Sequence, residues 1–253
     1  MASRTVVVTG GGRGVGRGIS ESFLAAGAEV VICGRSEPEH PPEVEGRRAS
    51  FVSADVRELE QIDAVVRFAL ERTGRLDVLV NNAGGAPAAD AATASPRFSE
   101  AILRLNLIAP LHFAQKANAV MQDQPEGGVI INIASVSGIR PSPGTAAYGA
   151  AKAGLLSLTQ TLAVEWAPKV RVVAVTAGMI RTEQSELHYG DEAGIEAVGA
   201  TVPLGRMGEP GDVGDACLFL ASPLARYVSG VSLVVHGGGE QPAFLAAAKN
   251  TRT

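Results

Sequence analysis

Residues 5–18, TVVVTGGGRGVGRG, pass from a β-branched apolar segment directly into a glycine-rich turn. Glycine at the end of a strand lets the backbone approach a phosphate closely, and the amides and dipole of the following helix attract its negative charge. The glycines fit the spacing G-x-x-x-G-x-G at Gly10, Gly14 and Gly16 rather than G-x-G-x-x-G. The stretch predicts a pyrophosphate site between a first strand and a first helix; a glycine turn without a ligand is the alternative.

Short apolar runs alternate with longer helix-like segments along the rest of the chain. Most runs are continuously apolar, which is typical of strands covered by helices on both faces. The segments between them carry apolar residues at helical spacing and end at or near a glycine. This βαβα order predicts an α/β fold with a mostly parallel, doubly wound sheet. The runs are TVVVT (5–9), AEVVICG (28–34), ASFVSAD (49–55), LDVLVNNAG (76–84), GVIINIAS (128–135), VRVVAVTAG (170–178) and GVSLVVHGG (230–238).

Two segments depart from this alternation. Residues 36–50, SEPEHPPEVEGRRAS, contain three prolines, which oppose a full helix, so we expect a loop or a very short helix there. Residues 240–253, EQPAFLAAAKNTRT, follow the last run and are predicted to form a frayed or interface-bound tail. No linker or repeat interrupts the chain, so residues 1–253 are predicted to form one domain.

The composition narrows the functional classes. The 253 residues are 46% hydrophobic and 19% charged, which suits a globular chain with a large core. The net charge of -4 provides no basic excess for nucleic acid or an anionic membrane. Cys33 and Cys217 stand in apolar runs and are predicted to be buried thiols. Histidines and cysteines lack ligand-like spacing, so no metal site is predicted.

The start of the chain bears on its location. In MASRTVVVTG (1–10) a single arginine precedes a short apolar run. The run is too short for a signal peptide or a membrane span. We therefore expect a cytoplasmic enzyme that acts on a small molecule and does not contact a membrane.

A polar pair stands in the apolar segment AAYGAAKAGLLSLTQTLAVEWA (146–167). Tyr148 and Lys152 are four residues apart, so they are neighbours on one side of a helix. The surrounding Ala, Leu and Gly residues suit burial or close packing. A surface tyrosine beside a surface lysine is the alternative.

Taken together, the motifs resemble the short-chain dehydrogenase/reductase family, in order and over nearly the whole chain. They are TGGGRGVG at the start, NNAG after the fourth run, Ser135, YGAAK around Tyr148, and GMIRT after the sixth run. The resemblance implies a single Rossmann-type domain with a seven-stranded parallel sheet and helices on both faces. It also implies an NAD(P)-dependent oxidoreductase that moves hydride between its cofactor and a carbonyl or alcohol carbon.

The resemblance also implies four catalytic residues. Tyr148 is expected to be the general acid and base, and the Lys152 ammonium is expected to favour its phenolate, because an unperturbed phenol titrates near pH 10. Lys152 is also expected to bind the ribose hydroxyls. Ser135 would polarise the substrate oxygen, although alone it could be a turn residue. Asn106 would hold a water-linked proton relay, or equally bond to a locally irregular helix backbone.

Further positions match the cofactor contacts of the family. Asp55 is expected to meet the adenine edge, with a helix N-cap as the alternative. Val173 and Ala177 replace an asparagine and a proline that are common in the family, so the loop after the sixth run is expected to be less rigid. The expected cofactor-binding residues are Gly10, Arg13, Gly14, Val15, Gly16, Arg35, Asp55, Val56, Asn82, Ala83, Gly84, Tyr148, Lys152, Gly178, Ile180 and Thr182.

The end of the second run favours NADP(H) over NAD(H). Relatives that bind NAD place a carboxylate there, which bonds the adenosine ribose and would repel a 2′-phosphate. Here that position is Gly34, and Arg35 follows it. Arg35 and Arg13 could converge on the phosphate, or Arg35 could be solvated. Glu37 or Glu39 could still serve NAD(H).

The substrate is less well defined by the sequence. Residues 183–203, EQSELHYGDEAGIEAVGATVP, match the mobile lid of the family and contain no Lys or Arg, which disfavours a strongly anionic substrate. Arg97, Arg140 or Arg206 could reverse that balance. The expected pocket residues are Ile139, Met179, Leu187 and His188.

Assembly is predicted from two segments, 97–121 and 146–167. Both carry more apolar surface than one helix face needs, and the family commonly pairs such helices. We expect a homotetramer, or otherwise a dimer. Two other functions are open: a cofactor-sensing regulator without turnover, and a dehydratase or epimerase on the same scaffold.

Overall fold

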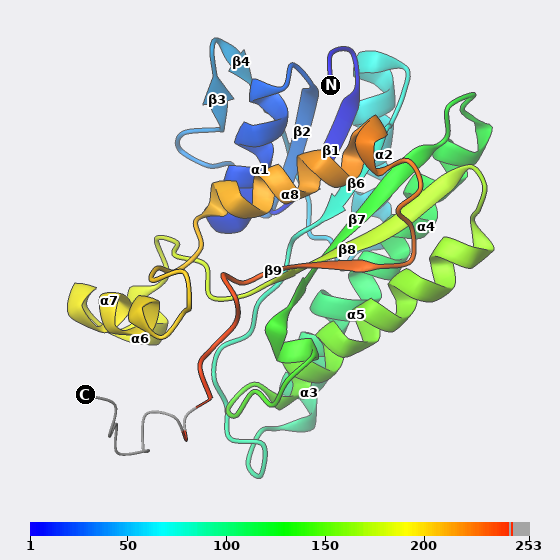
Figure 1. The fold of residues 1–253 in the computed structure, drawn as a ribbon. Coiled ribbons are helices and arrows are strands. Elements are labelled where there is room, and N and C mark those ends of the chain that lie inside the picture. Colours follow the sequence, from blue (N-terminus) through cyan, green and yellow to red (C-terminus); the bar gives the residue numbers. More distant parts are fainter. Residues whose placement is uncertain (243, 245–253) are drawn as a thin grey trace.

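The structure is a computed structural model that describes residues 1–242 and 244. Seven parallel strands form one twisted sheet in the order β5-β2-β1-β6-β7-β8-β9 (Figure 1). The doubly wound α/β fold predicted from the alternating pattern is confirmed. The strands are β1 (Thr5–Thr9), β2 (Glu29–Gly34), β5 (Ser50–Ser53), β6 (Val78–Asn81), β7 (Gly128–Ser135), β8 (Val170–Ala177) and β9 (Ser232–Val235).

Helices cover both faces of the sheet, and their packing follows from the alternation of side chains along each strand. Val6 and Val8 face a core shared with α1 and α8, whereas Val7 faces a second core shared with α2, α4 and α5. All three valines are fully buried, and burial of each stabilises the fold by about 1.5–3 kcal/mol. The helices are α1 (Gly14–Ala25), α2 (Leu59–Thr73), α3 (Pro96–Leu103), α4 (Ala109–Asp123), α5 (Ala146–Glu165), α6 (Glu186–Tyr189), α7 (Glu192–Ala200) and α8 (Pro210–Ala221).

The proline-rich connection after β2 contains a hairpin, so the expectation of a very short helix there is wrong and that of a loop is correct in part. Strands β3 (Glu43–Val44) and β4 (Arg47–Arg48) pair in antiparallel register. Glu45 and Gly46 both have positive φ, 51° and 76°, which suits a two-residue turn between twisted strands. The hairpin is a separate two-stranded sheet beside α1 (Figure 1).

The prediction of two buried thiols is confirmed. Cys33 and Cys217 are free and buried, and burial raises the pKa of the Cys33 thiol to about 12. Within the described residues, no helix is long and apolar enough to cross a membrane. Most of the predicted tail, residues 240–253, lies outside the described residues.

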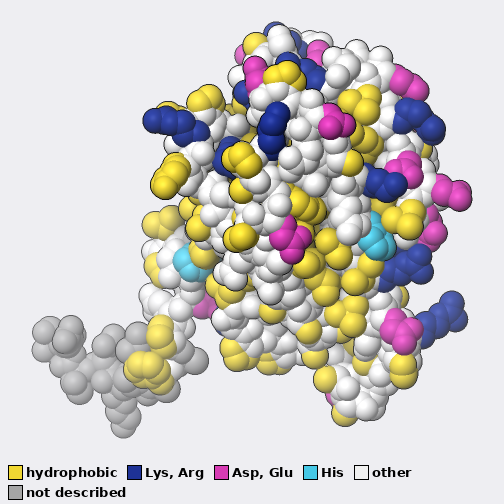
Figure 2. All heavy atoms as spheres, turned by 90° about the vertical axis from the view of Figure 1, so that its right-hand side faces the viewer, with side chains coloured by type: hydrophobic (Ala, Val, Ile, Leu, Met, Phe, Trp, Pro, Cys, Tyr) yellow, Lys and Arg dark blue, Asp and Glu magenta, His cyan; other side chains and the backbone are white. Residues whose placement is uncertain are grey.

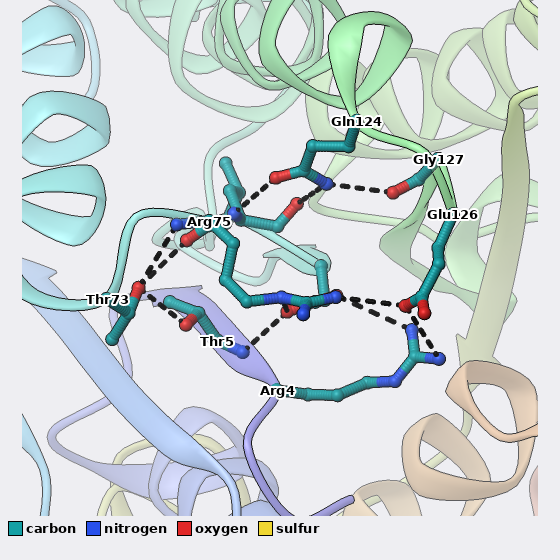
Figure 3. A network of polar contacts seen from close by, with 9 residues as sticks. Arg4, Thr5, Thr73, Arg75, Gln124, Glu126 and Gly127 are labelled. Atoms are coloured by element: carbon teal, nitrogen blue, oxygen red, sulfur yellow. Dashed lines mark hydrogen bonds and ion pairs between the residues drawn. The ribbon is translucent and has the colours of Figure 1, made fainter.

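A polar cluster lies at the amino ends of β1, β6 and β7, at the opposite edge of the sheet from the glycine-rich turn (Figure 3). Its centre is the carboxylate of Asp77, which is fully buried. The Thr5 amide donates to Oδ2 at 2.8 Å, and Arg75 donates to both oxygens, at 2.8 and 2.5 Å. Arg4 lies 3.5 Å from Oδ1. This cluster joins the N-terminal segment to the middle of the sheet.

Candidate functional site

The glycine-rich turn lies at the carboxyl end of β1, where the strand order reverses between β1 and β6. Gly10 has a φ of 63°, and a Cβ at Gly16 would stand 2.2 Å from the Gly10 carbonyl oxygen, so a larger residue at position 16 would displace the turn. Arg13 is the N-cap of α1 in extended conformation, and its side chain makes no capping bond. The first amides of α1 are therefore available to an anion.

The NNAG stretch after β6 supports this turn directly. The Asn82 side chain donates to the carbonyl oxygens of Thr9 and Gly10, at 2.8 and 3.3 Å. The Thr9 hydroxyl accepts from the amides of Asn82 and Ala83, both at 2.9 Å. The structure thus brings together two motifs that stand about 70 positions apart, as their order in the family implies.

The segment after β8 approaches the same turn. A Cβ at Gly14 would lie 3.5 Å from the Thr182 methyl group. The Gly208 amide donates to the Met179 carbonyl oxygen at 2.9 Å, and the Arg181 amide donates to the Gly208 carbonyl oxygen at 2.8 Å. Gly208 thus bonds to both chain neighbours of Ile180 and fixes the backbone at that residue. The lower rigidity expected from Val173 and Ala177 stays a prediction.

Ser135 and Tyr148 meet at the carboxyl end of β7. The Ser135 hydroxyl accepts from the Ser137 amide at 3.2 Å, so the residue also serves as a turn residue. Burial raises the pKa of Tyr148, and a hydrogen bond with the Ser135 side chain lowers it in part. Burial is the larger of these two effects. The expected stabilisation of the phenolate by Lys152 stays a prediction.

Lys152 lies beneath Tyr148, one turn further along α5. Its side chain is buried, and Nζ donates to the Ile133 carbonyl oxygen at 2.7 Å. Nζ stands 5.5 Å from the centre of the Tyr148 ring. The alternative of a surface pair is therefore wrong. Burial away from water lowers the pKa of Lys152 to about 8.

Asn106 lies in a π-helical turn, Arg104–Ile108, between α3 and α4. Its side chain is fully buried and donates to the carbonyl oxygens of Gly85 and Ile102, at 3.0 and 2.9 Å. Its Oδ1 accepts from the Gly85 amide at 2.8 Å. A Cβ at Gly84 would stand 2.6 Å from that oxygen and 3.4 Å from the Lys152 ammonium. Asn106 thus bonds to an irregular backbone and also lies beside Lys152.

Asp55 lies after β5 and is paired with Arg57. Arg57 donates through Nε and Nη2 at 2.9 and 2.5 Å, and its amide donates at 3.0 Å. The bonds from Arg57 lower the pKa of the Asp55 carboxyl to about 2. Helix α2 begins at Leu59 with Glu58 as its N-cap, so the alternative of Asp55 as an N-cap is wrong. Val56 is buried in the core beside α2.

The proline-rich loop folds over the glycine-rich turn. A Cβ at Gly12 would stand 2.9 Å from the Pro38 ring, and Arg17 donates to the His40 carbonyl oxygen at 2.8 Å. Arg13, in the glycine-rich turn, and Arg35, directly after β2, are both exposed. The positive field of Arg35 reaches Asp55 and contributes to its lowered pKa.

Two hollows lie near Tyr148 and Ser135. Tyr148 lines the first, together with the apolar side chains of Ala86, Pro87, Phe98 and Ile102. The second lies over the carboxyl ends of β7, β8 and β9. It is lined by Val136, Ile139, Arg140, Gly178, Met179, His236, Gly239 and Glu240.

The second hollow tests the expected substrate residues. Ile139 and Met179 line it as expected, whereas Leu187 and His188 lie exposed on α6. Of the three arginines considered, Arg140 lines the hollow, and Arg206 is paired with Asp212 at 2.7 Å. Arg97 is exposed on α3.

Comparison with known proteins gives a consistent result. Residues 10–240 match the family model described as enoyl-(acyl carrier protein) reductase. The chain is 36% identical to 3beta-hydroxysteroid dehydrogenase 1 of Eggerthella lenta, over 94% of each chain. It is also 36% identical to L-rhamnose 1-dehydrogenase (NAD(P)(+)) of Azotobacter vinelandii, over 94% of this chain and 97% of the relative. The chain belongs to the short-chain dehydrogenase/reductase family.

A solved structure agrees with this assignment. The ligand-free aldohexose dehydrogenase of Thermoplasma acidophilum superposes on this short-chain dehydrogenase/reductase with a TM-score of 0.87. The two are 28% identical, and the alignment covers 100% of this chain and 97% of the other. The protein is therefore an NAD(P)-dependent enzyme that acts on CH–OH or C=O groups.

Sequence reasoning missed three charged or titratable residues of this dehydrogenase. Arg57 lies two positions after Asp55, and that spacing suits a local carboxylate-guanidinium pair. His236 follows the last strand, so its place at the carboxyl edge of the sheet could have been inferred. Glu240 reaches the site through the fold of a loop, and no pattern in the sequence indicates it.

Lys152 is expected to make the stability of the cofactor-free enzyme depend on pH. Its folded pKa of about 8 lies below the ordinary value of 10.5, so the unfolded chain binds more protons between these values. The free energy of unfolding contributed by this residue therefore rises with pH across this window. Denaturant titrations at several pH values should show wild type gaining on the order of 3 kcal/mol relative to Lys152→Met. Parallel pH profiles of the two proteins would contradict the buried position of the ammonium.

Proposed function

We propose that this enzyme transfers hydride between NADP(H) and a carbonyl or secondary alcohol, with Tyr148 as general acid and base. The observation that carries the proposal is the grouping of four polar side chains beside the glycine-rich turn. Ser135 is close enough to lower the pKa of Tyr148, Lys152 lies 5.5 Å from the tyrosine ring, and Asn106 lies beside Lys152. These groups come from β7, α5 and the π-helical turn, so the fold holds them rigidly.

The glycine-rich turn and its neighbours fit a dinucleotide. The free amides at the start of α1 would hold the pyrophosphate, with Gly10, Gly14, Val15 and Gly16 forming the turn. When bound, the nicotinamide supplies or accepts the hydride. The expected contacts along the rest of the cofactor are Asp55, Val56, Asn82, Ala83, Gly84, Gly178, Ile180 and Thr182.

The protein's own side chains carry out the proton transfer. In reduction, the Tyr148 hydroxyl gives its proton to the carbonyl oxygen of the substrate, and in oxidation the phenolate takes the proton back. The Ser135 hydroxyl donates a hydrogen bond to the same oxygen and steadies its developing charge. The Lys152 ammonium stabilises the phenolate, and positive charge on the oxidised cofactor would add to this effect. Asn106 holds the loop at Gly85 that covers Lys152.

The cofactor preference rests on the ends of β2 and β5. Gly34 has no carboxylate. In relatives that bind NAD, a carboxylate at this position accepts hydrogen bonds from the adenosine ribose hydroxyls. Asp55 is the nearby carboxylate after β5, and it is engaged by Arg57. Arg13 and Arg35 are exposed and could each give a charge-assisted bond to a 2′-phosphate. Glu37 and Glu39 are exposed on the loop.

Arg35→Ala is expected to lower kcat/KM for NADPH by about tenfold or more and to leave kcat/KM for NADH nearly unchanged. One charge-assisted hydrogen bond is worth about 1.5–3 kcal/mol, and 1.4 kcal/mol is a factor of ten. Initial rates with each cofactor measure the ratio. Arg226→Ala, which removes an exposed arginine from the end of the 3-10 turn Pro223–Ala225 that follows α8, is the matched control. Equal losses with both cofactors would assign Arg35 to support of the loop.

The reciprocal variant, Gly34→Asp, should raise the ratio of NADH to NADPH use. A Cβ at Gly34 meets no atom closer than 3.8 Å, so the new side chain fits without strain. It would supply the carboxylate that is missing after β2. An unchanged ratio of NADH to NADPH use would argue that the end of β2 does not contact the adenosine ribose.

Activity itself is tested by following the absorbance of NADPH against a panel of ketones and aldehydes, including 3-ketosteroids and aldoses. Relatives of this chain are named for hydroxysteroids, L-rhamnose and aldohexoses, so we expect a small-molecule alcohol or its carbonyl partner. Tight cofactor binding without turnover across the panel would favour a cofactor-sensing regulator. Product formation without net cofactor oxidation would favour an epimerase or dehydratase.

We also propose a single-domain, cytoplasmic homotetramer, or otherwise a dimer. Val164 on α5 is 80% exposed and Ile108, just before α4, is 39% exposed. Helices α4 and α5 lie on the right-hand side of Figure 1, and Figure 2 shows that side from the front. Hydrophobic side chains gather over the middle and lower part of this face. Pairing of these helices with those of a second subunit would cover such surface. Light scattering at micromolar concentration measures the state.

A further inference from the structure

The second hollow contains an ion pair between two distant parts of the chain. Arg140 follows β7 by way of a 3-10 turn, and Glu240 follows β9. Arg140 donates through Nη2 to Oε1 of Glu240 and through Nη1 to the Pro141 carbonyl oxygen at 3.0 Å. The two side chains are 39% and 35% exposed, so both are accessible to a molecule in the hollow.

The position of this pair differs from that of an ordinary surface salt bridge. Its neighbours in the hollow are Met179 and His236, which come from the ends of β8 and β9, and Val136, which directly follows Ser135. Tyr189 of the lid is close enough for its pKa to be lowered by Arg140 and raised by Glu240, while burial raises it. The ion pair thus lies in a hollow that includes the neighbour of Ser135, and its charges reach Tyr189 of the lid.

The charges on the pair decide which substrates the hollow can accept. A guanidinium in a half-buried pocket is the usual partner of a carboxylate, because its planar donors match two carboxylate oxygens. Here Glu240 already takes the place that such a carboxylate would occupy, and it adds a negative charge to the hollow. Among the described residues, the pair leaves N–H donors and a carboxylate oxygen that could bond neutral polar groups.

We propose that Glu240 is a specificity-determining residue that occupies Arg140 and thereby makes the pocket select neutral polar substrates over anionic ones. The proposal rests on the proposed function, since it takes the second hollow as part of the substrate site. Acidic residues of the lid act in the same direction. Glu183 and Glu186 lie in the segment 183–203, which carries no Lys or Arg. Removal of the Glu240 charge should free Arg140 to bind a carboxylate.

The test uses two ketones that differ in charge, 4-oxocyclohexanecarboxamide and 4-oxocyclohexanecarboxylate. Calorimetry gives the dissociation constant of each for the holoenzyme with oxidised cofactor, where no turnover occurs. Wild type should bind the amide about tenfold or more tightly than the carboxylate. Glu240→Gln, which keeps the size of the side chain, should reverse or abolish this ratio by strengthening carboxylate binding.

Two further variants keep the test decisive. Arg140→Gln should weaken carboxylate binding beyond that of wild type, because Glu240 then faces the ligand unpaired. The double variant Arg140→Gln/Glu240→Gln should lose the gain seen in Glu240→Gln. A ratio that is the same in wild type and Glu240→Gln overturns the proposal, as does a lack of binding of both probes to every protein.

The outcome is separable from that of the proposed function. Binding is read without catalysis, so a shift in the ratio stands even if the panel shows no turnover of these ketones. Conversely, reduction of the amide by wild type with no shift in Glu240→Gln would leave the catalytic proposal intact and reject the role of Glu240. Thermal unfolding of each variant checks that Glu240→Gln, at a half-exposed position, retains the fold.

Discussion

Tyr148→Phe is expected to lower kcat by about 100-fold or more, because a positioned general acid or base contributes about 10²–10⁴-fold. The substitution keeps the ring, its packing in the first turn of α5, and its place above the Lys152 ammonium. Only the oxygen that exchanges a proton with the substrate is removed. Cofactor affinity, measured by fluorescence titration with NADPH, should therefore change little.

The matched control is Tyr227→Phe, which removes the same hydroxyl from a fully exposed side chain. It should leave both kcat and cofactor affinity at the wild-type level. Retention of more than about a tenth of the activity by Tyr148→Phe would be incompatible with general acid catalysis by this residue. Loss of cofactor affinity together with activity would show that the phenol supports the binding site instead.

Burial shifts the pKa values of Tyr148 and Lys152, and the sequence pattern did not indicate these shifts. The i, i+4 spacing placed Lys152 beneath Tyr148, and the structure agrees. The resemblance to the family also implied that the ammonium would favour the phenolate. In the structure, burial raises the pKa of Tyr148 and lowers that of Lys152. Short-range spacing can be read from a sequence, whereas desolvation depends on everything packed around the pair.

The sheet could be predicted because its information is local. Runs such as residues 5–9 and 170–178 are apolar on both faces, and each face is then covered by helices. The glycine-rich turn after Thr9 was predictable for the same reason, since strand, turn and helix are adjacent in the chain. The seven-stranded parallel sheet was implied by the resemblance to a family, whereas the strand order was not predicted, because no local pattern sets it.

The features that escaped prediction depend either on contacts between distant residues or on a weak local signal. An irregular helix backbone at Asn106 was one of the expectations, but its two hydrogen bonds to Gly85 span 21 positions and no local pattern indicates them. Glu240 reaches Arg140 across 100 positions. The hairpin between β2 and β5 depends on a local turn at Glu45 and Gly46, where a non-glycine residue with positive φ gives a weak signal.

Asp77→Ala is expected to lower the free energy of unfolding by about 3–5 kcal/mol, the cost of removing one partner of a buried ion pair. The variant leaves the Thr5 amide and the Arg75 guanidinium without their shared acceptor. Glu126, 3.0 Å from Arg75, is the acidic neighbour left in the cluster (Figure 3). Urea denaturation followed by circular dichroism gives the change.

A matched aspartate separates this effect from simple loss of charge. Asp63 pairs with Lys116 at 2.8 Å, but its side chain is 49% exposed, so Asp63→Ala should cost less than about 1 kcal/mol. Asp77→Asn keeps an acceptor for the Thr5 amide and should fall between the two.

The cluster lies at the edge of the sheet opposite Ser135, so folded Asp77→Asn should retain the wild-type kcat. Equal stability of Asp77→Ala and Asp63→Ala would mean that the N-terminal segment is held by β1 pairing alone. A fall in kcat for folded Asp77→Asn would instead mean that strain at the amino edge reaches the carboxyl ends of β6 and β7. Because the bonds lost in the variant all lie at the amino edge of the sheet, the energetic cost is expected to remain there.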